Sequence, residues 1–353
     1  MRSVTLILAG LFLFGLLAGC GDSVREAAFD AASGIVERNH KLPFSALRAI
    51  LVSLEDDPDL FYVGKQILFL GENNGEKRAL LVRFRHARAD NHYKPAERDF
   101  SGYYFDGERW LTLPYTRARH DSTNLLAQND FYFGSLQWVD STRSGTLFYD
   151  RDNITLGLEF GDLIPVQSFR DNDTRLRAHA FGEATLRTMT DTVSGMVYCQ
   201  LEELAGFNPL VEKGSGIEKV NYEWVALQSS GGLRLLASSD SATAKNRLLK
   251  NFLAIQQDEQ ILYADGSDNF RISSDVIRRD PKIFDHLALK KSAAVPELDF
   301  AMSFELTEQR FFYTSGFALA LVTGTVELGS QTYEVWGVLE HQQQPKPDPE
   351  TLK

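Results

Sequence analysis

Short runs in which apolar and polar residues alternate, separated by turn residues, make up most of the chain from Phe61 onward. Residues 62–70 and 78–88 flank Asn74-Gly75, a pair that tolerates positive φ and is a strong hairpin signal. The further runs in this half cover residues 103–105, 109–113, 131–139, 145–149 and 154–160. The pattern predicts an antiparallel meander, and closing such a sheet into a barrel would remove its exposed edges.

A second β-rich half begins near Gly195. Here a turn at 229–232 follows a strand predicted from Tyr222, and strands continue to residue 340. Residues 245–255 and 282–291 are interpreted as short helices. The chain is therefore predicted to be mainly β, with two consecutive antiparallel barrels or barrel-like sandwiches.

The first nineteen residues have the pattern of a secretory signal peptide. Arg2 precedes an apolar stretch, and Ala18-Gly19 precedes Cys20. The stretch is shorter than the roughly 20 residues that a spanning helix needs. The residues before Cys20 resemble the bacterial lipobox, which implies a lipid-modified (palmitate-type) Cys20; the alternative is an ordinary signal peptide with a chance cysteine. Gly21 rather than aspartate follows, which favours the outer membrane over the inner one.

These patterns divide the chain into five predicted segments. They are a signal peptide at 1–19, a lipid anchor and helical spacer at 20–50, β domains at 51–194 and 195–341, and a disordered tail at 342–353. The spacer helix is predicted from a capping box at its start, in which a serine is followed three residues later by glutamate.

Composition narrows the possible partners. The formal net charge of −11 argues against nucleic acid and against electrostatic attachment to an anionic membrane. Lipidation of Cys20 would leave Cys199 without an intramolecular partner, and its apolar neighbours predict a buried thiol. The predicted location is the periplasmic face of the cell envelope.

Three segments resemble the carotenoid 1,2-hydratase (hydroxyneurosporene synthase)-like family. They are residues 59–63 with 81–85, residues 222–228 with 231–235, and the closing segment 333–337. The resemblance implies two lipocalin-like barrels. Leu60-Phe61 stands where the family has a Trp-Trp pair, so hydratase activity does not follow directly. The alternative is an unrelated all-β lipoprotein with similar hairpins.

Arg83 and Arg85 would point to one face of a strand, with Val82 and Phe84 on the other. Inside a barrel the two guanidinium groups would need anionic partners, for which Asp59, Glu223 or an acidic ligand are candidates. The alternative places the arginines on an outer face. No motif for a metal or cofactor is found, and a zinc site at His86 and His92 is less favoured than a solvated loop.

Aromatic residues are candidates for lining an apolar cavity, although core packing explains each one as well. They are Tyr62, Tyr104, Trp110, Trp138, Trp224 and Trp336. Asp59 and Glu223 occupy matching places at the starts of the two predicted barrels. A desolvated acid there would have a raised pKa and could protonate an alkene or a carbonyl, whereas the alternative is a structural carboxylate.

Three functions remain open at this point. The favoured one is non-enzymatic: a lipid-anchored protein that binds a hydrophobic or amphipathic molecule in the envelope. The second is an enzyme that acts by acid catalysis on an apolar substrate. The third is an accessory lipoprotein that presents a β surface to a protein partner in the envelope.

Overall fold

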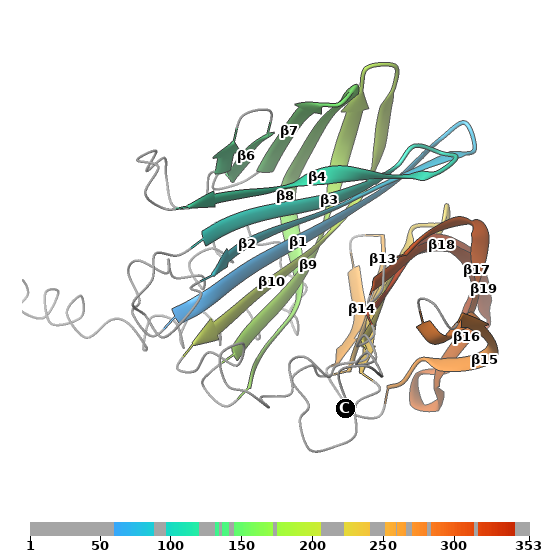
Figure 1. Cartoon of the computed structure of the whole chain (residues 1–353). Helices are drawn as coiled ribbons and strands as arrows, with labels where there is room; N and C mark the ends of the chain where they lie inside the picture. The colour runs from blue at the N-terminus through green and yellow to red at the C-terminus, as the bar shows by residue number, and fades with distance from the viewer. Residues whose placement is uncertain are drawn as a thin grey trace, which may run out of the picture.

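The computed structural model of the chain describes residues 60–87, 97–119, 131–133, 136–140, 145–171, 175–205, 222–240, 251–258, 260–265, 270–280, 284–313 and 317–342. These residues form two curled antiparallel sheets that pack side by side (Figure 1). Within these ranges, no helix has both the length and the apolar character to cross a membrane.

The first sheet has ten strands in the order β4-β3-β2-β1-β10-β9-β8-β7-β6-β5. They are β1 (Leu60–Asn73), β2 (Glu76–Ala87), β3 (Glu97–Phe105), β4 (Trp110–Arg119), β5 (Phe131–Phe133), β6 (Leu136–Asp140), β7 (Gly145–Arg151), β8 (Ile154–Asp171), β9 (Arg175–Thr188) and β10 (Thr192–Ala205). The predicted hairpin at Asn74-Gly75 is confirmed, since these residues have φ of 52° and 81° in the β1–β2 turn.

The second sheet has nine strands in the order β14-β13-β12-β11-β19-β18-β17-β16-β15. They are β11 (Tyr222–Gln228), β12 (Leu233–Asp240), β13 (Phe252–Gln257), β14 (Gln260–Asp265), β15 (Ser273–Asp280), β16 (Phe284–Val295), β17 (Phe300–Tyr313), β18 (Phe317–Leu328) and β19 (Gln331–Gln342). A single 3-10 turn, η2 (Pro296–Leu298), joins β16 to β17.

Both sheets follow one plan. The first and last strands of each sheet pair with each other, β1 with β10 and β11 with β19, as in an up-and-down barrel. The described strands leave β4 and β5 at the edges of the first sheet, and β14 and β15 at those of the second. We call the two sheets the first and second half-barrel. The predicted fold class is confirmed for them, while the predicted N-terminal helix lies outside the described residues.

Two details of the sequence prediction are wrong. The boundary near Gly195 falls inside β10, which pairs with β1 and β9 and so belongs to the first half-barrel. The segments interpreted as short helices overlap the strands β13 and β16. In β13 both faces are buried, because Leu253 and Ile255 point to one core and Phe252 and Ala254 to another. A strand that is apolar on both faces cannot be told from a buried helix by periodicity.

Alternation along the strands creates three apolar cores rather than two. In β1, Ile67 and Phe69 point into the first half-barrel, while Leu68 and Leu70 point outward. The outward residues meet the outer face of the second half-barrel, so a third core fills the space between the sheets. Burial of a large apolar side chain contributes about 1.5–3 kcal/mol, so this contact holds the two half-barrels together.

Glycine allows the closing strands to approach each other closely. A Cβ at Gly195 of β10 would lie 2.1 Å from the carbonyl oxygen of Leu70, and one at Gly337 of β19 would lie 1.8 Å from that of Ala226. Both distances are well inside van der Waals contact. Each half-barrel therefore has a glycine in its last strand, at a point where that strand pairs with the first strand of the same sheet.

Polar and aromatic contacts also cross between the half-barrels. The Tyr198 hydroxyl of β10 donates to the carbonyl oxygen of Leu227 in β11 at 3.0 Å. The ring of His179 in β9 stacks on Phe252 of β13 with centroids 4.1 Å apart. These contacts fix the position of one sheet against the other, so a site built from both can have a defined shape.

Candidate ligand-binding groove

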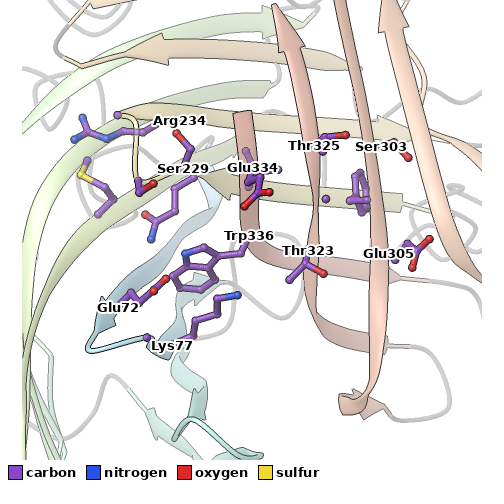
Figure 2. Close-up of a pocket in the computed structure, with 18 of the residues that line it drawn as sticks. Glu72, Lys77, Ser229, Arg234, Ser303, Glu305, Thr323, Thr325, Glu334 and Trp336 are labelled. Atoms are coloured by element: carbon purple, nitrogen blue, oxygen red, sulfur yellow. The ribbon is translucent and has the colours of Figure 1, made fainter. Parts of the chain in front are cut away.

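A groove of about 1110 Å³ lies between the half-barrels at the end where their hairpins gather. One side is the β1–β2 hairpin with part of β10, and the other is the β11–β12 turn with the outer face of β17, β18 and β19 (Figure 2). Its size is close to that of pockets that hold drug-sized molecules. Neither sheet alone forms this groove.

The floor of the groove consists of two registered rows of side chains on β17, β18 and β19. Ser303, Thr325 and Glu334 form the first row. The second row is Glu305, Thr323 and Trp336, extended to Gln228 of β11. These residues face outward because their strand neighbours, such as Phe304 and Val322, point into the core of the second half-barrel.

Trp336 forms the apolar wall of the groove together with Met196. Both side chains are 7% exposed and continue into the core between the sheets. The ammonium group of Lys77 lies over the Trp336 ring, 5.3 Å from its centroid (Figure 2). Such a cation–π contact contributes about 0.5–1 kcal/mol at an exposed site. The groove is therefore apolar at its inner wall and polar along its floor.

The charges in the groove differ in how far they are already engaged. Arg234 donates to the carbonyl oxygen of Asp258 at 3.0 Å and to Oε1 of Gln256 at 3.5 Å. Lys77 lies over Trp336. In contrast, the carboxylates of Glu72 and Glu334 make no hydrogen bond or ion pair with another residue of the described ranges. Hydrogen-bond acceptors are thus the groups that the groove offers to a ligand.

Arg83, a sequence candidate, lies on the outer face of the first half-barrel, and Val82 and Phe84 are in its core. Its guanidinium pairs with the buried Glu340 of β19. Gln66 bridges the pair, because its Oε1 accepts from Nε of Arg83 at 2.9 Å and its Nε2 donates to Glu340 at 3.2 Å. We call these three residues the polar seam.

The structure gives Arg83 a different partner from the ones predicted. The hypothesis named Asp59 or Glu223, but Glu223 lies on the opposite face of its sheet, and Asp59 is outside the described residues. The true partner is 257 positions away in the last strand, and no local pattern marks it. Burial raises the pKa of the neighbouring Tyr103, and the charge of Glu340 adds to that rise while Arg83 opposes it.

Glu223 points into the second half-barrel, on the same face of β11 as Val225 and Leu227. Its carboxylate pairs with the buried Lys291 of β16 and lies 3.1 Å from Nδ1 of His341 in β19. Burial alone would raise the pKa of Glu223, but the hydrogen bond from His341 and the charge of Lys291 outweigh it and hold the pKa below its ordinary value.

A lowered pKa is opposite to the direction expected from the sequence. Glu223 is ionised at neutral pH, so it does not have the proton that acid catalysis would require. Sequence reasoning missed Lys291, which it placed at the end of a helix, and His341. The interaction with His341 joins positions 118 apart in the chain through the β11–β19 pairing.

The other candidate aromatic residues lie in different cores. Tyr104 faces the interior of the first half-barrel, whereas Trp110 and Trp224 belong to the core between the sheets. Nε1 of Trp224 is buried, and none of the described residues accepts a hydrogen bond from it. Of these residues only Trp336 lines the groove. The structure does not describe Cys20 or the side chains of Tyr62, Arg85, His86, His92 and Trp138.

Cys199 is buried on the inner face of the first half-barrel, as its neighbours predict. Burial raises the pKa of its thiol to about 12, although the charge of Lys65 acts in the other direction. The thiol is therefore protonated at neutral pH and has little nucleophilic character. Among the described side chains, no three His, Cys, Asp or Glu residues are grouped so that they could hold a metal ion.

No protein-family model matches this chain. No curated protein matches its sequence either. Solved structures do match its fold. A Nitrosomonas europaea protein assigned as AttH has a TM-score of 0.57 at 11% identity, with 81% of this chain and 93% of that chain covered. Kievitone hydratase from Nectria haematococca has a TM-score of 0.52 at 11% identity, with coverage of 80% and 89%.

At this level of identity, the similarity shows the fold alone. The chain has the architecture of tandem lipocalin-like barrel proteins, here as two curled antiparallel half-barrels. This agrees with the fold that the hydratase-like resemblance implies, while the sequences themselves give no match to a family.

Proposed function

We propose that this protein binds an amphipathic molecule in the groove between its half-barrels and is held at the bacterial envelope by a lipid on Cys20. The observation that carries the proposal is the composition of the groove. A single space of about 1110 Å³ has an apolar wall, Trp336 with Met196, beside a floor of hydroxyl and carboxylate groups. An amphipathic molecule has the same division into an apolar and a polar part.

The apolar part of the ligand lies against Met196 and Trp336, where the groove meets the core between the sheets. Removal of a methylene group from water contributes about 0.8 kcal/mol, so even a short alkyl segment gives measurable affinity. The polar part lies over the rows that contain Thr323 and Thr325, whose hydroxyl groups can both donate and accept hydrogen bonds.

Binding rather than catalysis is proposed because the groups in the groove and around it support recognition. The candidate acid, Glu223, faces the other side of its sheet and is held ionised by His341 and Lys291. Arg83 is engaged with Glu340 in the seam. The groove contains hydrogen-bonding groups of defined register, which suit the orientation of a bound molecule.

Delipidated full-length protein titrated with N-phenyl-1-naphthylamine, an uncharged fluorescent probe of apolar sites, tests this function. We expect saturable binding that weakens about tenfold in Met196→Ala, because the lost side chain forms part of the wall. The matched control is Met189→Ala, since Met189 is 70% exposed and lies outside the groove lining. If the folded wild-type protein binds no probe, or if both variants bind it equally well, the proposal is wrong. Circular dichroism checks that each variant is folded.

The anchor requires a separate experiment. Cells that express the chain are fed labelled palmitate, and the membrane and soluble fractions are compared for wild type and Cys20→Ser. We expect the label and membrane attachment to be lost in the variant. Label and membrane attachment that survive the substitution would contradict a lipid at Cys20.

A further inference from the structure

The floor of the groove offers more hydrogen-bond acceptors than donors. Ser303, Thr323 and Thr325 can each act as donor and acceptor, whereas an ionised carboxylate such as that of Glu305 or Glu334 only accepts. Neighbouring strands lie about 4.8 Å apart, so these groups form a regular grid on the outer face of the sheet. A ligand with several O–H groups, spread over a ring, can meet such a grid at more than one point.

The charges make an anionic head-group unfavourable. The groove contains three glutamates, Glu72, Glu305 and Glu334, against Lys77 and Arg234. Arg234 is already held by the backbone oxygen of Asp258, and Lys77 lies over Trp336. A phosphate or carboxylate on the floor would therefore face like charges, and two of these, Glu72 and Glu334, have no counterion among the described residues. Like-charge contacts reduce affinity.

A cationic head-group is less suitable than an uncharged one, because Lys77 and Arg234 keep their positive charge at two sides of the floor. The Trp336 ring and the carbonyl oxygen of Asp258 contact these cations without neutralising them. Figure 2 shows Arg234 near the β11–β12 turn and Lys77 beside Trp336, with Thr323 and Thr325 both on β18. Hydroxyl groups satisfy both kinds of neighbour, since they donate to the glutamates and accept from the two cations.

We infer that the head-group bound in this groove is an uncharged, hydroxyl-rich ring, so that the ligand class is a glycolipid rather than a phospholipid or a fatty acid. The inference rests on the proposed function, since it assumes that the groove binds an amphipathic molecule. It assigns Thr323, Thr325 and Glu334 the recognition of the sugar, and Met196 with Trp336 the contact with the tail.

Three amphiphiles with the same twelve-carbon tail test separately whether the groove binds an amphipathic molecule and whether it prefers a sugar head-group. Dodecyl maltoside, dodecyl phosphate and dodecyltrimethylammonium, each below its critical micelle concentration, compete with N-phenyl-1-naphthylamine for the full-length protein. We expect the maltoside to bind at least about tenfold more tightly than the other two. The substitutions Thr323→Val and Glu334→Gln should each weaken maltoside binding about fivefold and leave the affinity for the phosphate unchanged or higher. The matched control is Thr146→Val, on an exposed position of β7 outside the groove lining.

Each outcome tests either the proposed function or the assignment of a sugar head-group. If none of the three amphiphiles competes with the probe, the proposed function itself fails. Equal competition by all three would leave the function standing and overturn the sugar head-group. Tighter binding of the phosphate or of the ammonium compound would overturn it as well, as would Thr323→Val and Glu334→Gln variants that bind maltoside like the wild type.

Discussion

The polar seam and the groove both lie where the two half-barrels meet, and they differ in how their polar groups are satisfied. In the seam, Arg83, Gln66 and Glu340 are joined by an ion pair and two hydrogen bonds across the two sheets. In the groove, Glu72 and Glu334 have no partner among the described residues. A closed network holds parts of a protein together, whereas open polar groups in a cavity are available to another molecule.

This difference predicts that substitutions in the seam change stability, while substitutions in the groove change binding. The largest effect is expected for Glu340→Ala, which leaves the guanidinium of Arg83 partly buried without its partner. Loss of one member of a buried ion pair costs about 3–5 kcal/mol, and the free energy of unfolding in urea measures it. The double variant Arg83→Met with Glu340→Leu should recover much of the loss. A single variant as stable as the wild type would show that the seam does not hold the sheets together.

The next effect is expected for Tyr198→Phe. The change removes the hydroxyl that donates to the buried carbonyl oxygen of Leu227 across the sheets. We expect a loss of about 0.5–1.5 kcal/mol in the free energy of unfolding, the net contribution of one hydrogen bond. Phe181→Leu removes an aromatic partner of Tyr198 without affecting this hydrogen bond, so it separates packing from the polar contact.

The Glu223 cluster predicts a pH dependence of the stability of the second half-barrel. The pKa of Glu223 is lower in the folded chain than its ordinary value of 4.5, so its contribution to stability is present above that pH. The contribution is lost as the pH falls through the lower folded value. Glu223→Gln should therefore be less stable than the wild type at pH 7, and the difference in stability should narrow as the pH falls below 4.5. A difference in melting temperature between the wild type and Glu223→Gln that does not change with pH would contradict an ionised Glu223.

The smallest effect on stability is expected in the groove. Thr323 and Glu334 are exposed, and the described ranges hold no hydrogen-bond partner for either side chain. Thr323→Val and Glu334→Gln should each change the free energy of unfolding by no more than about 0.5 kcal/mol. Calorimetric melting of the two variants without ligand checks this. A loss above about 2 kcal/mol in the free energy of unfolding would show that these residues stabilise the fold, as the seam does, and are not simply part of a binding surface.

Local features of the fold could be predicted from the sequence because they depend on neighbours in the chain. The hairpin at Asn74-Gly75 follows from residues that tolerate positive φ. The position of Val82 and Phe84 inside, with Arg83 outside, follows from alternation along one strand. Trp336 was singled out as a candidate lining residue, and the groove that it lines lies between the half-barrels and not within one.

The long-range contacts could not be predicted in this way. Gln66 and Glu340 are 274 positions apart, and the pairing of β11 with β19 brings His341 to Glu223. The strand β16 was mistaken for a helix, so the place of Lys291 on an inner face was also missed. Such contacts depend on which strand closes a sheet and which faces of two sheets meet. The local pattern of apolar and polar residues determines neither.

The amino-acid sequence by itself determined the class of structure, since alternation and turn residues specify antiparallel strands, and the inward or outward direction of a side chain follows from its position in the strand. Only the tertiary structure decided which outward faces became a core, which became the seam and which remained open as the groove. The physical reason is that a strand has two faces of similar composition, and only packing against a second sheet decides whether an outward polar group finds a partner in the chain or stays available to a ligand.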